Sequence, residues 1–192
     1  MPQREEPLVP GKHYHIFNRG INSEIIFRTD RNYHFFLRRM KELLTLEITH
    51  IYAYVLMPTH YHMLVNINSN DFSTAMGRLS NSYTKAYNRD CKRTGPLFEG
   101  RFKSKLVASD EHILGLSRYM HLNPVVAHLV KKPDSWSFSN SKELINNKEG
   151  NASESNIILS FFENVNPRIG YKNFVEDGLN YQSKQFDHLL FD

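Results

Sequence analysis

The fold is decided by the stretch Met57-Pro58-Thr59-His60-Tyr61-His62-Met63-Leu64-Val65. Residues i and i+2 of a β-strand point to the same side of a sheet, so His60 and His62 are expected to share one face. The opposite face is uniformly apolar and carries Tyr61, Met63, Val65 and Ile67. Two imidazoles side by side on a packed sheet supply two ligands for a divalent metal ion.

The segments around this stretch predict a ferredoxin-like α+β fold. Runs rich in β-branched and aromatic residues indicate strands, and apolar residues spaced three and four apart indicate helices. The predicted strands span 13–17, 48–56, 60–67 and 102–107, and the predicted helices span 30–46 and 71–88. This β-α-β-β-α-β order is typical of a ferredoxin-like sandwich with an antiparallel sheet.

A third helix is expected to follow, beginning at Ser109 and ending near Leu122, because the residue before Pro124 avoids helical dihedrals. Tyr119 and Asn123 lie four residues apart, which places them on one helix face if the helix reaches Asn123. A phenol hydroxyl can act as a nucleophile and an amide oxygen can bind a metal. A helical tyrosine considered alone is far more commonly a packing residue.

Composition favours one folded domain with an appendage. Of the 192 residues, 40% are hydrophobic and 12% aromatic, and the single cysteine excludes an internal disulfide. We expect a domain over 1–140, with its core at about 12–130, and a linker with a small helical tail over 141–192. The polar run 146–156 is the predicted linker, and 157–165 and 171–179 are predicted short helices. With no signal peptide or transmembrane-length run, the expected location is cytoplasmic, without a membrane partner.

A basic segment predicts contact with nucleic acid. The chain carries a net charge of +4, and its cations gather at Lys85, Arg89, Lys92, Arg93, Arg101, Lys103 and Lys105. Lysine and arginine neutralise phosphates, and aromatic rings can stack on unpaired bases. Aromatic residues are interleaved with these cations, at Tyr83, Tyr87, Phe98 and Phe102. The alternative is a solvated basic loop whose aromatic residues are buried.

A second histidine pair competes with the first. His13-Tyr14-His15 repeats the tripeptide of residues 60–62, but its predicted strand is shorter and begins beside Gly11. Strand packing is therefore the first interpretation of His13 and His15, and their entry into the metal site stays open.

Four phrases in fixed order resemble a known family: Arg19-Gly20, Leu56-Met57-Pro58-x-His60-Tyr61-His62, Gly95-x-Leu97-Phe98-x-Gly100-Arg101-Phe102 and Arg118-Tyr119-Met120-His121-Leu122-Asn123-Pro124-Val125-Val126. They are similar to the HUH single-tyrosine transposases of small bacterial insertion sequences, in the REP-associated tyrosine transposase subgroup. The resemblance covers roughly residues 12–140. A bare His-x-His is a weak signal, whereas the ordered set is specific. Tyr61 departs from the usual apolar middle residue by its polar tip.

The resemblance implies a DNA transposase that nicks and rejoins single-stranded DNA at hairpin-flanked sites. Tyr119 would be the nucleophile that forms a 5′-phosphotyrosine, and His60, His62 and Asn123 would bind Mg²⁺ or Mn²⁺. Arg19 and the basic segment would hold the DNA. Insertion-sequence relatives are dimers and the subgroup is expected to act as monomers, so monomer and homodimer both stay open.

Two other functions remain open. One is a non-catalytic, domesticated single-stranded nucleic-acid-binding protein of ferredoxin-like fold. The other is a zinc hydrolase that would recruit His112 or His121 as a further ligand, although neither forms a recognised spacing with His60.

Overall fold

The computed structural model describes residues 7–146 and 157–180. The chain forms two compact units, which we describe separately. Of the described residues, the first unit contains those up to Ile51 together with Pro58–Ala108, and the second contains Tyr52–Met57 and those from Ser109 onward. None of the described helices is long and apolar enough to cross a membrane.

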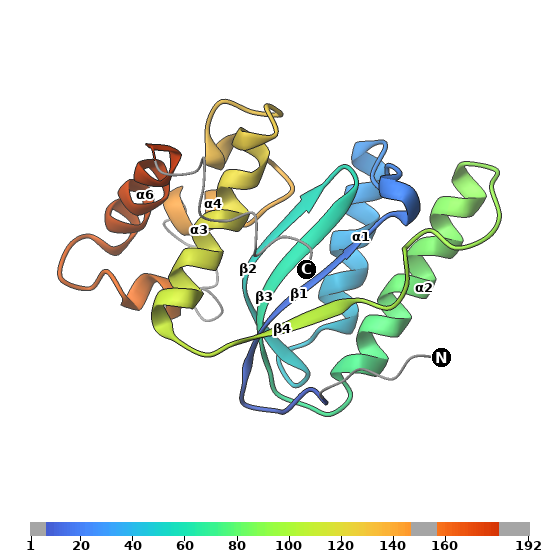
Figure 1. Cartoon of the computed structure of the whole chain (residues 1–192), viewed down its shortest axis with the longest axis horizontal. Helices are drawn as coiled ribbons and strands as arrows, with labels where there is room; N and C mark the ends of the chain where they lie inside the picture. Colours follow the sequence, from blue (N-terminus) through green and yellow to red (C-terminus); the bar gives the residue numbers. More distant parts are fainter. Residues whose placement is uncertain (1–6, 147–156, 181–192) are drawn as a thin grey trace. The chain divides into compact units, whose positions relative to one another are not determined.

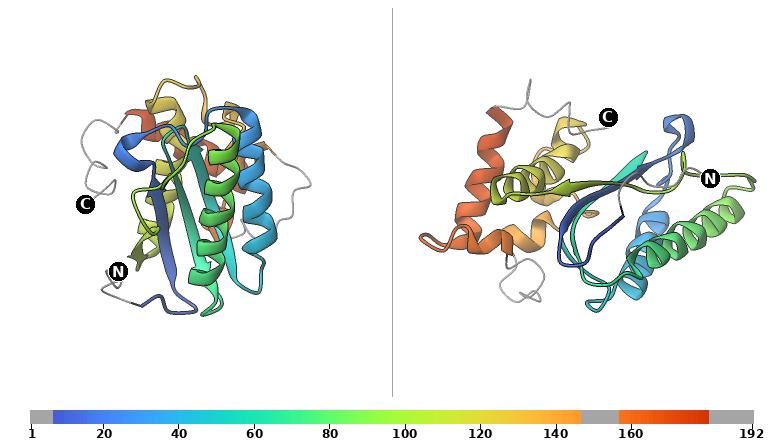
Figure 2. Two further views of the ribbon diagram at one scale, coloured as in Figure 1. Left: turned by 90° about the vertical axis from the view of Figure 1, so that its right-hand side faces the viewer. Right: turned by 60° about the horizontal axis from the view of Figure 1, so that its bottom comes forward.

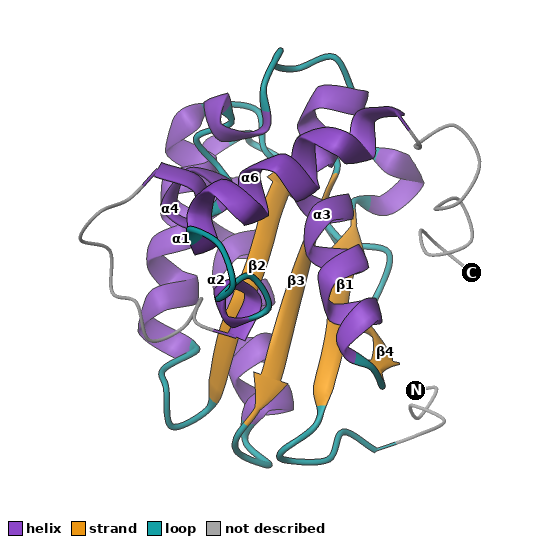
Figure 3. Ribbon diagram, turned by 90° about the vertical axis from the view of Figure 1, so that its left-hand side faces the viewer, coloured by secondary structure: helices purple, strands orange, loops and turns teal. Residues whose placement is uncertain are grey.

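A four-stranded antiparallel sheet takes three of its strands wholly from the first unit. Its strands are β1 (His13–Arg19), β2 (Thr49–Met57), β3 (His60–Ile67) and β4 (Lys103–Val107). They lie in the order β2-β3-β1-β4, as Figure 3 shows. Pro58 and Thr59 connect β2 to β3, and β1 pairs antiparallel with both β3 and β4. The predicted ferredoxin-like α+β class is therefore confirmed, and β3 has the predicted bounds.

Two helices, α1 (Asp30–Leu43) and α2 (Phe72–Asp90), lie side by side on one face of this sheet (Figures 1 and 2). α1 begins after Thr29, whose N–H donates to Asn32 Oδ1 at 3.3 Å. A short 3-10 turn, η1 (Ile21–Ser23), precedes it. The helices cover the apolar face of β3, because the Tyr61 ring lies 5.1 Å from that of Phe36 and is fully buried.

The second unit is built around α3 (Asp110–Val126). Its other elements are η2 (Pro133–Ser135), α4 (Ser141–Asn146), a helical turn over 157–160, α6 (Pro167–Asp177) and η3 (Gly178–Asn180). The end of β2 belongs to this unit: Leu56 N–H donates to the Phe138 carbonyl at 2.9 Å, and Trp136 Nε1–H donates to the Leu56 carbonyl at 3.0 Å.

The expected end of the third helix is wrong, because α3 continues through Pro124 to Val126. Proline removes only one backbone donor, and the next turn still closes, with Ala127 N–H donating to the Asn123 carbonyl at 2.9 Å. The last predicted tail helix begins earlier than expected, at Pro167, where Asn166 caps it. Most of the predicted linker, 147–156, lies outside the described residues.

Candidate functional site

His60 and His62 lie side by side at the start of β3. Their ring centroids are 5.0 Å apart and the rings meet edge to face at 77°. His60 Nδ1 lies 2.9 Å from Thr59 Oγ1, and His62 Nδ1 lies 2.8 Å from His15 Nε2. In both rings a protein partner engages Nδ1, so Nε2 is the nitrogen suited to coordinate a metal.

Both histidines are held in their neutral form. Burial, helped by the nearby Arg19 charge, lowers the pKa of His60 to about 4. Burial also lowers the pKa of His62 well below its usual value, and His15 and His60 contribute to this shift. A neutral imidazole is the form that binds metal ions, so this pair is ready to coordinate a metal at neutral pH.

The pair fits a cation that takes its remaining ligands from oxygen atoms. Within residues 7–146 and 157–180, no group of three or more His, Cys, Asp or Glu side chains could hold a metal ion. An amide, water or phosphate oxygen could supply further ligands for a bound cation. Asn123 offers an amide oxygen, and its distance from the histidines stays a prediction because it belongs to the second unit.

The second histidine pair, His13 and His15, lies on the same face of the sheet as His60 and His62. Strand pairing places His15 opposite Leu64 and Phe17 opposite His62, so His15 is the diagonal neighbour of His62. We call this surface the histidine face; it comprises His15, Phe17, Arg19, His60, His62, Leu64, Lys103 and Lys105. The contact between His15 and His62 was missed from the sequence, because it depends on the register between two distant strands.

Seven of the eight predicted DNA-binding cations fall into two groups. Arg19 lies opposite His60, and Lys103 and Lys105 lie opposite Phe17 and His15, so these three belong to the histidine face. Arg19 also pairs with Glu99 at 2.5 Å. The other group lies on α2 or just beyond its end and comprises Lys85, Arg89, Lys92 and Arg93. Arg101 is exposed just before β4.

The aromatic residues of the basic segment belong to the core. The Tyr83 hydroxyl donates to the Ile26 carbonyl, and the Tyr87 hydroxyl donates to the Ile25 carbonyl at 2.5 Å. Phe98 and Phe102 are also buried. The alternative of buried aromatic residues is therefore correct, and these rings do not form a stacking surface for bases.

Tyr119 and Asn123 lie on α3 in the second unit, one turn apart as predicted. Tyr119 is 6% exposed, and Asn123 is half-buried. The helix begins at a capping serine, because the Ser109 hydroxyl accepts the His112 N–H at 3.2 Å. This geometry puts both predicted side chains in a continuous helix with a fixed spacing.

His121 lies on the same helix and is fully buried in a polar network. Its Nε2 is 3.0 Å from Asn140 Oδ1, and its Nδ1 is 2.7 Å from the Tyr171 hydroxyl. Asn140 Oδ1 also accepts the Tyr54 N–H, so His121 carries its proton on Nε2 and accepts from Tyr171. Both ring nitrogens of this candidate zinc ligand are therefore engaged by protein groups.

Helix α6 packs against α3 within the second unit. The Arg118 guanidinium lies 4.4 Å from the centre of the Phe174 ring. A Cβ placed on Gly178 would lie 2.7 Å from the Arg118 side chain and 2.8 Å from that of Leu122. The tail thus supports the turns of α3 that flank Tyr119.

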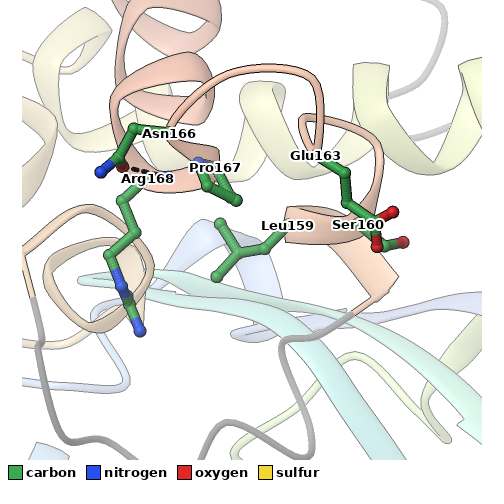
Figure 4. A pocket seen from close by; sticks show the side chains of 6 residues that line it. All are labelled: Leu159, Ser160, Glu163, Asn166, Pro167 and Arg168. Carbon is green, nitrogen blue, oxygen red and sulfur yellow. Dashed lines mark hydrogen bonds between the residues drawn. The ribbon is translucent and has the colours of Figure 1, made fainter.

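A pocket in the second unit contains none of the predicted site residues (Figure 4). It is lined by Leu159, Ser160, Glu163, Asn166, Pro167 and Arg168. The Arg168 side chain donates to the Leu144 carbonyl at 3.1 Å, and the Asn166 side chain caps α6. These polar groups therefore stabilise helix ends.

Comparison with known proteins supports the fold. No model of a protein family matches the chain, and no curated protein matches it. A solved structure of a REP-associated tyrosine transposase bound to a REP hairpin is similar, with a TM-score of 0.59 and 18% sequence identity. The match covers 74% of this chain and 84% of that one. The protein therefore shares its fold with a REP-associated tyrosine transposase.

Proposed function

We propose that the protein is a REP-associated tyrosine transposase of the HUH single-tyrosine class. It would nick and rejoin single-stranded DNA at hairpin-flanked sites through a 5′-phosphotyrosine intermediate. The observation that carries this proposal is the pair of neutral histidines, His60 half-buried and His62 buried, side by side on the sheet of a fold shared with a hairpin-bound transposase. Hairpin DNA is the expected partner, and the oligomeric state, monomer or homodimer, stays a prediction.

The ligands would be His60 and His62 through their Nε2 atoms, with Asn123 as the oxygen donor. A bound Mg²⁺ or Mn²⁺ would offset the charge that develops on the scissile phosphate during attack. Mg²⁺ strongly prefers oxygen ligands, so two imidazoles favour Mn²⁺ in vitro.

Tyr119 would supply the nucleophile. A bond forms between its phenol oxygen and phosphorus as the bond from phosphorus to the 3′-oxygen breaks. The phenol loses a proton and the departing 3′-oxygen gains one, so charge is conserved overall. The phosphotyrosine retains the energy of the original phosphodiester, and attack by another 3′-hydroxyl can rejoin the strand.

The strand would be held by the predicted cations, which neutralise its phosphates. Among them, Arg19, Lys103 and Lys105 share the histidine face with the metal ligands, so we assign them the phosphates nearest the cut. Lys85, Arg89, Lys92, Arg93 and Arg101 would contact more distant parts of the substrate.

The test is covalent capture of labelled DNA. Single-stranded hairpin DNA from the sequence flanking the gene is incubated with the protein and Mn²⁺, and the products are separated on a denaturing protein gel. Wild type is expected to give a labelled band at protein mass, and Tyr119→Phe and His62→Ala are expected to give none. Tyr87→Phe is the matched control, because its hydroxyl already donates to the Ile25 carbonyl.

Each alternative predicts a different gel. An adduct that persists in Tyr119→Phe would assign the nucleophile to another residue. Cleavage without any adduct would favour the metal-dependent hydrolase. A shift on a native gel without cleavage would favour the domesticated binding protein.

A further inference from the structure

His15 lies outside the predicted ligand set but contacts one of its members. Its Nε2 is 2.8 Å from His62 Nδ1, and both side chains are buried, with exposures of 2% and 0%. We propose that His15 is a positioning residue that fixes the tautomer and ring orientation in which His62 coordinates the metal through Nε2. This inference rests on the proposed function, in which His62 is a ligand.

The sheet itself brings the two rings together. Because β1 and β3 pair in antiparallel register, His15 is the diagonal neighbour of His62 on the histidine face. The ring centroids are 5.0 Å apart and the ring planes are inclined by 27°, so the two rings lie nearly end to end along their hydrogen bond. Phe17 stacks on His15 at 4.7 Å and lies 6.0 Å from His62. The His62 ring is therefore held in position by neighbours on β1 as well as by its own strand.

A hydrogen bond between two neutral imidazoles requires one donor and one acceptor. When His62 Nδ1–H donates to His15 Nε2, His62 keeps a lone pair on Nε2 and can bind a metal there. In the reverse arrangement His62 carries its proton on Nε2 and cannot coordinate through that atom. His15 as acceptor is thus the arrangement that is compatible with metal binding.

The hydrogen-bond acceptors of metal-binding histidines strongly affect the affinity for the metal. A ligating histidine usually donates its second ring N–H to a neighbouring acceptor, and loss of that acceptor typically weakens metal binding by about 10- to 100-fold. In this chain the acceptor is a second histidine from a strand 47 residues away in sequence.

The experiment measures Mn²⁺ binding to the DNA-free protein by electron paramagnetic resonance. His15→Phe removes the acceptor and keeps an aromatic ring, whereas His15→Gln keeps an acceptor oxygen. His15→Phe is expected to weaken Mn²⁺ binding by about 10-fold or more, and His15→Gln to recover most of the affinity. His13→Phe is the matched control on the same strand, since His13 pairs with Asn66, and it should bind like wild type.

A second readout does not require metal. Nitrogen-15 NMR of the histidine rings in the metal-free wild type should show His62 protonated on Nδ1.

A His62 ring protonated on Nε2, or unchanged Mn²⁺ affinity in His15→Phe, would overturn the assignment of His15. If Mn²⁺ binds wild type and His15→Phe equally but fails to bind His62→Ala, the proposed metal site survives and this assignment alone is rejected. If wild type binds no Mn²⁺, both are rejected.

Discussion

The Tyr171 hydroxyl of α6 lies 2.7 Å from Nδ1 of His121 in α3, and both side chains are fully buried. His121 also donates through Nε2 to Asn140, whose side-chain amide in turn donates to the Tyr52 carbonyl of β2 at 3.0 Å. One buried polar network therefore joins α6, α3 and the part of β2 that belongs to the second unit. Each of its members is expected to contribute to the stability of the second unit.

Replacement of Tyr171 by phenylalanine should destabilise the protein. The change leaves His121 Nδ1 buried without its donor, and an unsatisfied buried polar atom costs about 1–3 kcal/mol. The free energy of unfolding in urea should fall by that amount. The double variant His121→Leu/Tyr171→Phe should lose less unfolding free energy than the sum of the losses in the two single variants, because both single changes remove the same hydrogen bond. Additive losses would mean that the two side chains do not interact.

The stability of the protein should fall as the pH is lowered from about 6.5 to about 4. Burial lowers the pKa of His121 to about 4, so in this range the unfolded chain takes up a proton that the folded chain does not. His121 alone would contribute a loss of about 3 kcal/mol across this window. Urea midpoints measured between these pH values should decline less steeply in His121→Leu. A decline of the same steepness in His121→Leu would contradict this prediction.

Two glycine-to-alanine changes should have opposite effects on stability. A Cβ on Gly20 would lie 2.3 Å from the Glu24 carbonyl oxygen and 2.8 Å from the Ile26 side chain, so the backbone would have to move. Gly20→Ala should therefore destabilise by about 1–3 kcal/mol. Gly77 is inside α2 with nothing within 4 Å of the added atom, and Gly77→Ala should stabilise by about 0.5–1 kcal/mol. Thermal unfolding of both variants tests these two predictions, and a Gly20→Ala protein as stable as wild type would contradict the close approach of Gly20 to Glu24 and Ile26.

The two groups of cations should differ in their contribution to DNA binding. Lys103→Ala and Lys105→Ala remove charges from the histidine face, and each should weaken binding of single-stranded DNA and lower the salt slope by about 0.7. Lys85→Ala removes an exposed charge from α2 and should weaken DNA binding less. Fluorescence anisotropy over a salt series, in the Tyr119→Phe background, measures both quantities. Equal losses at all three positions would place the DNA along α2 as well.

The order of the elements and the faces of the strands follow from the residue pattern alone. The period of two along β3 places His60 and His62 on one face and Tyr61 in the core, because backbone geometry enforces this alternation whatever the strand packs against. The helical spacing of Tyr119 and Asn123 is local for the same reason. Residue pattern was therefore sufficient for the ferredoxin-like class and for the histidine pair.

Predictions from local sequence were wrong where the burial of a side chain had the larger effect. Pro124 was expected to end α3, but it is buried in the helix and costs only one backbone hydrogen bond. Tyr83 and Tyr87 were candidates for stacking on bases, yet their hydroxyls donate to backbone carbonyls in the loop before α1. No residue pattern shows which way an aromatic side chain in a mixed basic segment will turn.

Which distant residues meet depends on the packing of the whole fold. The contact of His15 with His62 depends on the register between β1 and β3, and that of His121 with Tyr171 depends on the packing of α6 against α3. Both are set by the burial of many side chains at once, and a shift of one residue in either strand would turn His15 away from His62. The sequence thus specified the chemical groups, and their partners followed from long-range packing.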